Sequence, residues 1–546
     1  MRWKTPLHAF HRLRGSPDLE QQLTTQQPKS AVESTHPQPL NRPEVTMRKV
    51  RLPAAVAAAV LAITPAAAHA STARPSPALT VTVDASSQGG VTVPGNFLGL
   101  SFEEGALHEP WVSADHGNLA QMLDNLGRGS MRFAANGADA TAWQPDPSVP
   151  PPAWADGQVI TPTDLARAGA LARRTRWPID LGVNLFHDDP AAAASLAAAA
   201  GRQFGPLLRT IQLGNEPNLY LPVRGVPNYT TDAYVKQATA YLAAIGKSAH
   251  GVRFSGPDAA GFLWGLPQAD PITKPIPSWW SAYASAFGHQ TRFLDQHYYP
   301  LVNRPEIQTP ATIDNLLSKT TAANTRNFVD LFAQQARTAG LPAHLSETNN
   351  VANGGKAGVS NTLAAALWTV DYALTAAHEG ISGINFHQQP HDCGGYTWIC
   401  FPDQTATTDA RLQAQPSYYA GLLVSALRGG QFLPTRVSGT EANVTAYAVR
   451  SPDGAVRVVI DNLDNTLKGT VAVRINGGTA RWASLQRLEG PSLEATSGVR
   501  FAGSQVAPDG SFTPNRPRQI PVTGSTFNVP FTTPSAVLLN ITDRRR

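Results

Sequence analysis

The sequence predicts an α/β protein, a (β/α)8 TIM barrel followed by a C-terminal β-sandwich. Between residues 97 and 429, eight short apolar runs alternate with amphipathic or alanine-rich helical stretches, as in the units of a closed barrel. From residue 430 onward the helical period disappears, and alternating strands follow one another between Gly, Asn and Asp turns, as in a β-sandwich. An open, doubly wound sheet is the alternative to the barrel.

The expected barrel strands are the eight apolar runs, and helices lie between several of them. One helix is expected from Pro190 to Arg202, with Asp188 or Asp189 as its cap. The run Leu79–Asp84 alternates like the sandwich strands, so we expect it to add an N-terminal strand to that domain. The domains are therefore residues 71–95 and 430–546 for the sandwich and 96–429 for the barrel. The barrel strands are expected at residues 97–102, 131–133, 179–183, 210–213, 252–254, 293–295, 343–345 and 383–386.

Composition argues for a folded protein without a nucleic-acid partner. The chain has 546 residues, of which 42% are hydrophobic and 15% charged. The first 70 residues hold nine Lys/Arg and four Asp/Glu, which accounts for the whole formal charge of +5. The rest of the chain is neutral, whereas a nucleic-acid binder needs a basic face.

The N-terminal segment predicts secretion. From Met47 a basic stretch precedes the apolar run Leu52–Ile63, and Ala68-His69-Ala70 has the pattern of a signal-peptidase site. Residues 47–70 are therefore expected to be a signal peptide, with the mature protein starting near Ser71 and residues 1–46 an upstream extension that is not native. The apolar run is too short to span a bilayer, and an uncleaved membrane anchor is the alternative.

The two cysteines are expected to form a disulfide. Cys393 and Cys400 lie seven residues apart in a Gly-rich segment, which suits a small closed loop in an exported protein. No second Cys pair and no H-x-x-x-H spacing lies beside them, so no metal site is expected. Phosphate-loop, dinucleotide-fold and G-x-S-x-G signatures do not occur either, so no cofactor is expected.

Two glutamates fall at the ends of predicted barrel strands, where barrel enzymes carry their reactive groups. Glu216 lies in Gly214-Asn215-Glu216-Pro217-Asn218 after strand four, and Glu347 lies in Ser346-Glu347-Thr348 after strand seven. Each alone could be a solvated loop charge or a helix cap. As a pair facing each other across a barrel mouth they suit glycoside hydrolysis, in which one carboxyl protonates the leaving group and the other attacks.

These strand ends resemble glycoside hydrolase family 79, the family of heparanases and β-glucuronidases. The resemblance covers nearly the whole mature chain. Heparanases have Gly-Gly where this chain has Ala134-Ala135, and His where it has Gln296. The segments that carry the resemblance are 214–218, 346–348 with Gly354-Gly355, 97–103, 132–136, 296–299 and 490–499.

The resemblance implies a retaining mechanism with Glu216 as acid/base and Glu347 as nucleophile. Arg132 and Tyr298 are the expected donors that keep Glu347 ionised, and Asn215 is expected to bind the sugar 2-hydroxyl. Glu103 and Asn136 are further substrate-binding candidates at matching strand ends. A pocket for the sugar carboxylate is expected at Gly354, Gly355 and Tyr396, where the alternative is a simple turn and a packing residue.

Three further positions stay open between binding and packing. Lys356 is either another carboxylate donor or a surface lysine. His297 is either a substrate contact or a hydrogen-bonded core residue, and Trp279-Trp280, in a Pro-rich loop, is either a sugar-stacking platform or loop core.

The function that follows is hydrolysis of β-linked glucuronic acid from an oligosaccharide or polysaccharide. Exo cleavage is favoured over heparanase-like endo cleavage, because heparanases bind sulfated chains along a basic cleft and this mature chain is neutral. One alternative is a retaining hydrolase of a neutral sugar, such as a xylosidase, arabinofuranosidase or glucosidase. The other is an inactive secreted carbohydrate-binding protein, against which the intact glutamate pair argues.

Overall fold

The computed structural model describes residues 79–155, 158–221, 224–261, 276–304, 309–478, 482–523, 525–531 and 533–542. All of them belong to one compact unit, Arg74–Arg546. The expected extension (1–46), signal peptide (47–70) and start at Ser71 lie outside the described residues. In the described part of the chain, no helix combines the length and the apolar character needed to cross a membrane.

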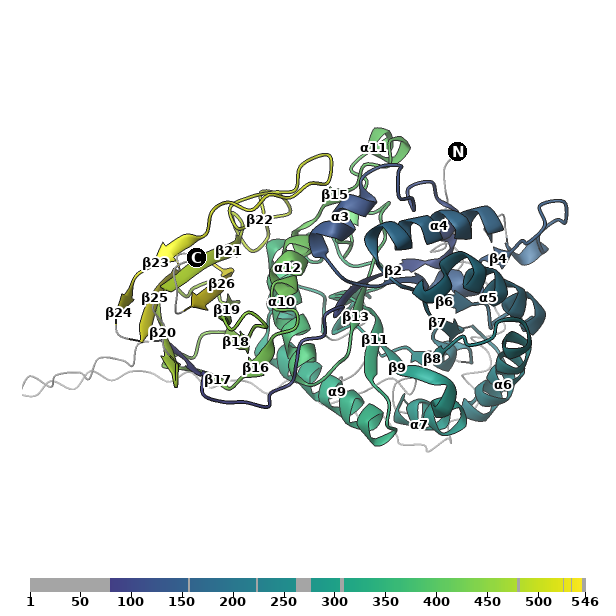
Figure 1. Ribbon diagram of the computed structural model, residues 1–546, viewed down its shortest axis with the longest axis horizontal. Helices are drawn as coiled ribbons and strands as arrows, with labels where there is room; N and C mark the ends of the chain where they lie inside the picture. Colours follow the sequence, from purple (N-terminus) through teal and green to yellow (C-terminus); the bar gives the residue numbers. More distant parts are fainter. Residues whose placement is uncertain are drawn as a thin grey trace, which may run out of the picture. The chain divides into compact units, whose positions relative to one another are not determined.

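Eight parallel strands close into a barrel in the order in which they occur along the chain (Figure 1). The last strand pairs with the first, through Ile384 opposite Leu98. The strands are buried on both faces, as parallel strands in such a fold are. The predicted barrel is confirmed, and the open sheet is wrong. The strands are β2 (Leu98–Glu103), β3 (Met131–Ala134), β6 (Ile179–Val183), β7 (Leu208–Leu213), β8 (Phe254–Ala259), β9 (Thr291–Tyr298), β11 (Ala343–Thr348) and β13 (Ile384–His387).

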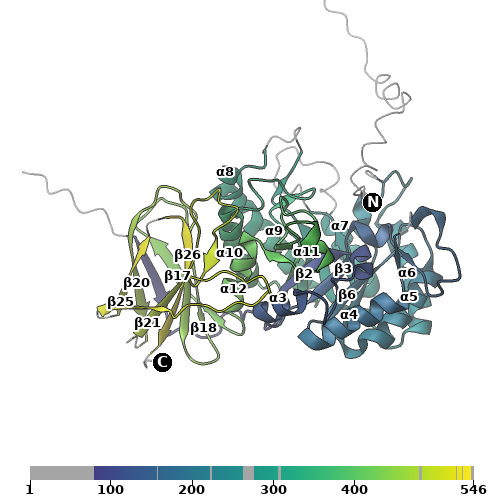
Figure 2. The ribbon, with the colours of Figure 1, turned by 90° about the horizontal axis from the view of Figure 1, so that it is seen from above.

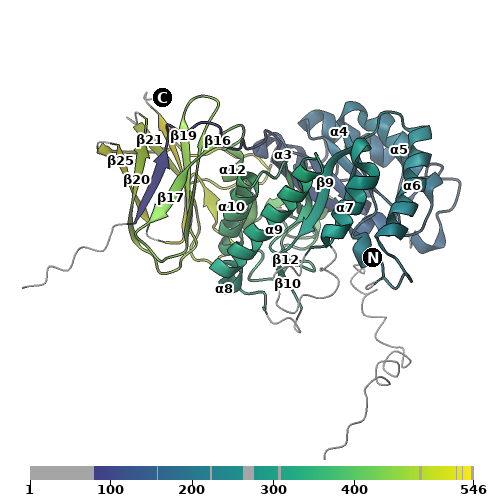
Figure 3. The same cartoon turned by 90° about the horizontal axis from the view of Figure 1, so that it is seen from below.

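A helix follows each barrel strand and covers the outside of the wall (Figures 1 and 3). The helix at Pro190 begins where the sequence predicts, and the Asp189 carboxylate accepts from the backbone N–H of Ala191 at 3.1 Å and of Ala192 at 2.9 Å. Asp189, rather than Asp188, is therefore the cap. The helices are α3 (Leu119–Leu126), α4 (Pro162–Thr175), α5 (Pro190–Phe204), α6 (Thr231–Ser248), α7 (Ile276–Phe287), α9 (Lys319–Thr338), α10 (Leu363–His378) and α12 (Pro416–Ser425).

Trp279 and Trp280 lie in helix α7 and not in a loop. Their exposed fractions are 5% and 1%. The Trp280 indole N–H donates to Gln296 Oε1 at 2.7 Å, and its ring packs 5.0 Å from that of Phe332. Both tryptophans are thus core residues between α7 and the barrel wall, and the interpretation as a sugar-stacking platform is wrong.

The β-sandwich consists of two sheets that enclose an apolar core. The N-terminal strand β1 lies between β17 and β20, antiparallel to the first and parallel to the second, so the predicted N-terminal contribution is confirmed. One sheet has the order β17 (Thr435–Ser438), β1 (Thr80–Asp84), β20 (Gly469–Asn476), β25 (Thr526–Phe531), β24 (Val522–Thr523). The other has the order β16 (Gln431–Leu433), β18 (Val444–Arg450), β19 (Val456–Asn462), β26 (Ser535–Thr542), β21 (Trp482–Glu489), β22 (Arg500–Phe501), with β23 (Arg518–Ile520) also on β21.

Helices α10 and α12 lie between the barrel strands and the sandwich (Figure 2). The first turn of α10 is tied to the sandwich by two backbone bonds, in which Leu363 N–H donates to Ala495 O and Ala364 N–H to Leu493 O, both at 2.9 Å. Further along α10, Asp371 accepts from the Tyr447 hydroxyl at 2.7 Å. Every side-chain position of α10 from Leu363 to Ala377 is buried, so this helix is core to both domains.

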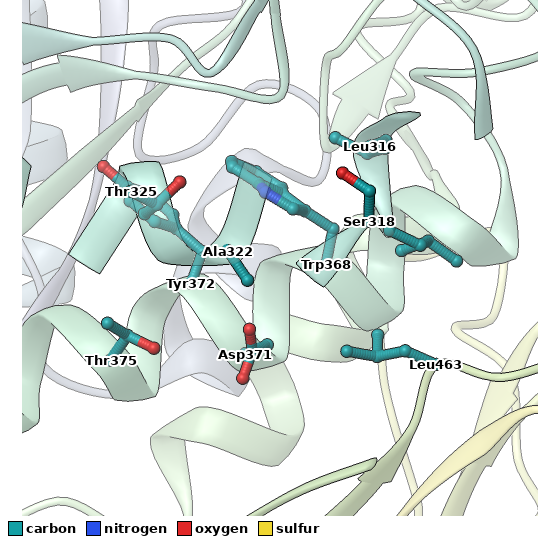
Figure 4. Close-up of a pocket in the computed structure, with 10 residues that line it drawn as sticks. Leu316, Ser318, Ala322, Thr325, Trp368, Asp371, Tyr372, Thr375 and Leu463 are labelled. Carbon is teal, nitrogen blue, oxygen red and sulfur yellow. The ribbon is translucent and has the colours of Figure 1, made fainter. Parts of the chain in front are cut away.

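Figure 4 shows a small cavity at this junction, where Trp368, Asp371 and Tyr372 of α10 meet Leu463 of the sandwich. Its volume of about 10 Å³ is near the minimum for one water molecule. Because it lies outside the barrel wall, between helices, it is a packing feature and not the functional site.

Candidate active site

The two predicted glutamates lie together at the carboxyl ends of the barrel strands. Glu216 follows β7 and has a left-handed backbone conformation, with φ at 48°. Glu347 is the second-last residue of β11. One carboxylate oxygen of each, with a ring nitrogen of His297, lies in a group whose atoms are all within 4.8 Å of one another. This separation suits a retaining pair, whose carboxyl groups lie about 5 to 5.5 Å apart, and is too short for the water of an inverting pair.

Glu347 is held as a carboxylate by cations and donors. Arg132 Nη1 donates to its Oε2 at 2.7 Å, and the Tyr299 hydroxyl donates to its Oε1 at 2.9 Å. Burial alone would raise the pKa of Glu347, but the charges of His297, His387 and Arg132 outweigh burial and lower it to about 2. The group is therefore ionised and oriented, as a nucleophile must be.

Arg132 is fully buried and bonds in several directions beneath the carboxylates. Besides Glu347, it donates to Gln212 Oε1 at 2.7 Å and to Ser101 Oγ at 2.9 Å. Its Nη2 donates to Asn215 Oδ1 at 3.0 Å and forms an ion pair with Asp258. Because Arg132 occupies the side-chain oxygen of Asn215, only the NH₂ group of Asn215 can bind a substrate at the mouth of the barrel.

His297 connects Asp258 to Glu216. Its Nδ1 lies 3.0 Å from Glu216 Oε1, and its Nε2 lies 3.1 Å from Asp258 Oδ1. Burial would lower the pKa of His297, but Asp258 and Glu347 outweigh it and raise the pKa to about 10. The imidazolium therefore donates to Glu216. Of the two interpretations of His297, the buried and hydrogen-bonded residue is the one found, and its partner is the acid/base candidate.

Glu216, His297 and Glu347 also satisfy the distances of a metal-ligand group. Asp258, 3.1 Å from Nε2, favours the protonated form of His297, and an imidazolium offers no lone pair to a cation. Arg132, at 2.7 Å from Glu347, already supplies a positive charge there. The donor set fits an organic substrate better than a metal ion.

Tyr299, and not Tyr298, contacts the nucleophile candidate. The Tyr298 hydroxyl pairs with Thr325 Oγ1 of α9 at 2.9 Å, and its ring stacks on Phe328 outside the wall. The prediction of Tyr298 as a donor to Glu347 is therefore wrong. Side chains of a strand alternate between its two faces, so with His297 pointing inward, Tyr298 must point outward and Tyr299 inward.

The expected carboxylate pocket adjoins Tyr299. Tyr396 is 3% exposed, and its ring lies 6.0 Å from that of Tyr299. Gly354 and Gly355 have φ of 82° and 87°, and a Cβ on Gly355 would lie 2.6 Å from Tyr396 N, so only glycine fits there. Among the described residues, the backbone N–H groups of both glycines have no protein acceptor. Two backbone N–H groups without an acceptor in the described part of the chain thus lie in a segment that packs against the Tyr396 loop.

The loop that carries Tyr396 is closed by a disulfide between Cys393 and Cys400. Asn349 fixes the same loop to the barrel, since its NH₂ donates to the backbone oxygens of Tyr396 and His387, both at 3.0 Å. Lys356 donates to the Ala311 backbone oxygen at 2.8 Å, so its ammonium is engaged in a loop contact.

Glu103 is the last residue of β2 and Asn136 follows β3, the two strands that come after β13 around the barrel. Glu103 accepts from Gly137 N–H at 2.5 Å and lies 3.4 Å from His387 Nε2. Asn136 Oδ1 is 3.5 Å from Asn215 Nδ2, which brings the two predicted amides together. Just before Asn136, Ala135 adopts φ of 54°, a conformation that favours glycine, at a place where heparanases have Gly-Gly.

Three residues of the site were not predicted from the sequence: Asp258, Tyr299 and His387. Asp258 and His387 belong to strand ends that run beyond the predicted limits, to Ala259 in β8 and to His387 in β13. The pKa of His387 is raised because Glu347 and Glu103 outweigh burial, so it adds positive charge near the nucleophile candidate. Extending each apolar run to its next ionisable residue would have found Asp258 and His387.

Comparisons with known proteins agree with this geometry. Residues 446–538 match the model of the glycosyl hydrolase family 79 C-terminal beta domain. A beta-glucuronidase of Aspergillus niger is 27% identical over 308 residues, which cover 53% of this chain and 54% of the relative. A beta-glucuronidase of Neurospora crassa is 28% identical over 134 residues, 24% of this chain and 23% of the relative. The chain thus matches about half the length of the first relative and less of the second.

Solved structures share the fold at low identity. A 4-O-alpha-L-rhamnosyl-beta-D-glucuronidase from Fusarium oxysporum superposes with a TM-score of 0.68 at 20% identity, over 84% of this chain and all of that one. A GH51 arabinofuranosidase from Xanthomonas axonopodis gives a TM-score of 0.61 at 15% identity, over 85% and 100%. Together, the matched domain and the curated relatives confirm that this chain is related to glycoside hydrolase family 79.

Proposed function

We propose that this chain is a retaining glycoside hydrolase that removes β-linked glucuronic acid from the non-reducing ends of glycans. The observation that carries the proposal is the pair of carboxylates within 4.8 Å at the barrel mouth, one of which is held ionised by Arg132. Glu347 is the nucleophile and Glu216 the acid/base. The family relation supports the same roles.

The contacts suit a double displacement. Glu347 attacks the anomeric carbon while Glu216 gives its proton to the leaving oxygen, and Arg132 and Tyr299 keep the attacking carboxylate in place. Once the glycosyl-enzyme has formed, Glu347 carries no charge. Glu216 then acts as the base that deprotonates water, with His297 bonded to it throughout.

Selection of glucuronate is assigned to Gly354, Gly355 and Tyr396. Two free N–H groups and a phenol can donate to a sugar carboxylate without a full counter-charge, and the disulfide and Asn349 fix the loop that brings Tyr396 there. The β-glucuronidases among the curated relatives support this choice of sugar. The neutral charge of the mature chain favours exo cleavage over binding along a sulfated polymer.

A substrate panel tests the proposal directly. The p-nitrophenyl derivatives of β-glucuronide, β-glucoside, β-xyloside and α-arabinofuranoside differ in the sugar and share the leaving group. We expect kcat/KM to be highest for the glucuronide. A preference for a neutral sugar would contradict glucuronate as the substrate. No activity on any of the four would contradict the proposal that the chain is a glycoside hydrolase.

Tyr396→Phe tests the carboxylate pocket. Loss of one donor to a charged group corresponds to about tenfold in kcat/KM for the glucuronide. The matching glucoside lacks the carboxylate, so the ratio of the two kcat/KM values should fall by the same factor. A ratio equal to that of the wild type would mean that Tyr396 does not bind the carboxylate.

We further propose that the protein is secreted after cleavage behind Ala70. The basic segment, apolar run and Ala68-His69-Ala70 support this, as do the paired cysteines. N-terminal sequencing of extracellular protein should give Ser71. An intact Met1 or Met47 on a soluble extracellular species would contradict the proposal.

A further inference from the structure

The loops after β3, β6 and β7 carry side chains that the proposed mechanism does not use. Trp154 lies between β3 and α4, Phe186 and His187 lie between β6 and α5, and Arg224 lies between β7 and α6. All three loops start at the carboxyl ends of neighbouring strands, so they lie at the same mouth as the catalytic pair. Glu216 lies in the same connection as Arg224, between β7 and α6.

Arg224 is held in one orientation at this mouth. It forms an ion pair with Asp139, whose carboxylate also accepts from the Tyr220 hydroxyl at 2.9 Å. Its guanidinium lies 5.5 Å above the Phe186 ring and 5.0 Å above that of Tyr220. The side chain is still 19% exposed. The residue is therefore a rigid donor with one edge open to solvent.

Arg224 is also connected to the catalytic residues. Its Nη2 donates to Asn136 Oδ1 at 3.1 Å, and Asn136 meets Asn215, the neighbour of Glu216. The negative charge of Glu216 is among the influences that raise the pKa of Arg224 against burial, after Asp139 and Tyr220. The guanidinium thus lies on the acid/base side of the mouth.

Trp154 is joined to the Arg224 group through two further aromatic rings. Its indole stacks on the His187 ring at 3.8 Å between centroids and 11° between planes, and His187 in turn meets Phe186 edge-on at 5.1 Å. Trp154 is nevertheless 38% exposed, one of the most exposed large apolar side chains of the described residues. An exposed indole that is joined through the His187 and Phe186 rings to a fixed donor has the composition of a sugar-binding subsite.

We propose that Trp154 and Arg224 form the subsite for the sugar residue that leaves, with the indole stacked on its ring and the guanidinium bonded to its hydroxyls. The leaving oxygen receives its proton from Glu216, so the leaving group must lie on the acid/base side, where this surface is. The inference rests on the proposed function and adds the chemical class of the leaving group, a further sugar of a glycan.

The test compares two substrates that share the glucuronate. Glucuronosyl-β-1,4-glucose has a sugar as its leaving group, whereas β-glucuronyl fluoride has a single atom. For Trp154→Ala we expect the ratio of kcat/KM for the disaccharide to that for the fluoride to fall about tenfold, mainly through KM. Trp482→Ala in β21 of the sandwich is the matched control, because Trp482 has the same exposed fraction of 38%. The control should leave the ratio unchanged.

Arg224→Lys is a second, independent variant, since it keeps the positive charge beside Asp139 and loses the planar fork. It should lower the same ratio about threefold to tenfold. An unchanged ratio in both variants, with the wild type active on the fluoride, would overturn the subsite and leave the proposed function intact. A wild-type enzyme inactive on the fluoride would overturn both.

Discussion

The barrel contains two buried clusters of charged side chains whose ionisation differs. The mouth cluster consists of Arg132, Glu216, Asp258, His297 and Glu347. The base cluster consists of Asp180, Arg209, Asp295 and His344, three of which are the second residues of their strands, at the amino ends. In the base cluster Arg209 pairs with Asp180, and His344 Nδ1 lies 2.9 Å from Asp295.

The difference between the clusters follows from the number of cations. In the mouth cluster Arg132 and His297 together outweigh burial, so the pKa values of Asp258 and Glu347 are lowered. In the base cluster Arg209 is matched by Asp180, and burial decides the remaining groups. It lowers the pKa of His344 to about 3 and raises that of Asp295 well above its usual range. Asp258 and Glu347 therefore stay ionised at the mouth because two cations face them there.

Glu347→Ala should have the largest effect. Removing the proposed nucleophile should lower kcat/KM on p-nitrophenyl β-glucuronide by about three orders of magnitude or more. Azide can occupy the space and attack the same face, so it should restore part of the rate and give an α-glycosyl azide. Glu216→Ala should instead give a β-azide and spare substrates with good leaving groups. Near wild-type rates in both variants would contradict the assignment.

Asp180→Asn should affect stability instead of rate. It leaves the buried Arg209 without a carboxylate, which should lower the free energy of unfolding by about 3 kcal/mol. Urea unfolding measures this loss, and kcat of the folded protein should stay within about twofold, because Asp180 lies in the base cluster. A large loss of kcat at unchanged stability would remove the distinction between the two clusters.

Asp258→Asn should lower the rate although Asp258 itself does not contact the substrate. The substitution keeps the shape but removes the charge that anchors both Arg132 and His297. Because bonds to charged groups contribute about 1.5 to 3 kcal/mol, kcat should fall about tenfold to a hundredfold, with KM within about threefold. An equal change in KM with kcat preserved would show that Asp258 acts on binding instead.

Adjacent tyrosines provide a matched pair. Tyr299→Phe removes one donor to Glu347 and should lower kcat about tenfold. Tyr298→Phe removes only the bond to Thr325 outside the wall, so kcat should change less than about twofold. The reverse order of effects would mean that Tyr298 faces the substrate.

His344→Gln should change how stability depends on pH. The folded pKa of His344 is about 3, below the ordinary 6.5, so the unfolded chain binds the proton first as the pH falls. Between those two values His344 should cost roughly 1.4 kcal/mol of stability per pH unit on acidification. The pKa of Glu347 is lowered in the same direction, and its contribution to stability is lost only at lower pH, as the pH falls from 4.5 towards 2.

Urea unfolding at about pH 4 and about pH 6 measures this slope. The wild type should lose stability between the two, and His344→Gln, which keeps a donor and an acceptor, should lose less. Equal slopes would show that another group takes up the proton.

The fold and the two glutamates could be predicted because their signals are local. Each barrel strand is a short apolar run, and Glu216 and Glu347 follow such runs directly. The prediction of Tyr298 was wrong because the motif contains two adjacent tyrosines and does not show which one points into the barrel. The alternation of side chains between the two faces of the strand decides that Tyr299 reaches Glu347. Asp258 was missed because β8 continues through Gly256 and Pro257, which read as the end of a strand.

The connections across the barrel could not be read from the sequence at all. Arg132 and Glu347 are 215 residues apart, and His297 lies 81 residues from Glu216. Closure of the barrel brings these side chains together, and only then do their charges set one another's pKa values. Residue types at strand ends therefore indicate the chemistry, while the pairing of cations with carboxylates needs the structure.

The stereochemistry of the first product tests the central claim most directly. Proton NMR can follow p-nitrophenyl β-glucuronide and record the anomer released before mutarotation. A carboxylate pair this close leaves no room for a water molecule under the sugar, so the account predicts β-glucuronic acid first and the α-anomer only later. Release of the α-anomer first would contradict Glu347 as the nucleophile.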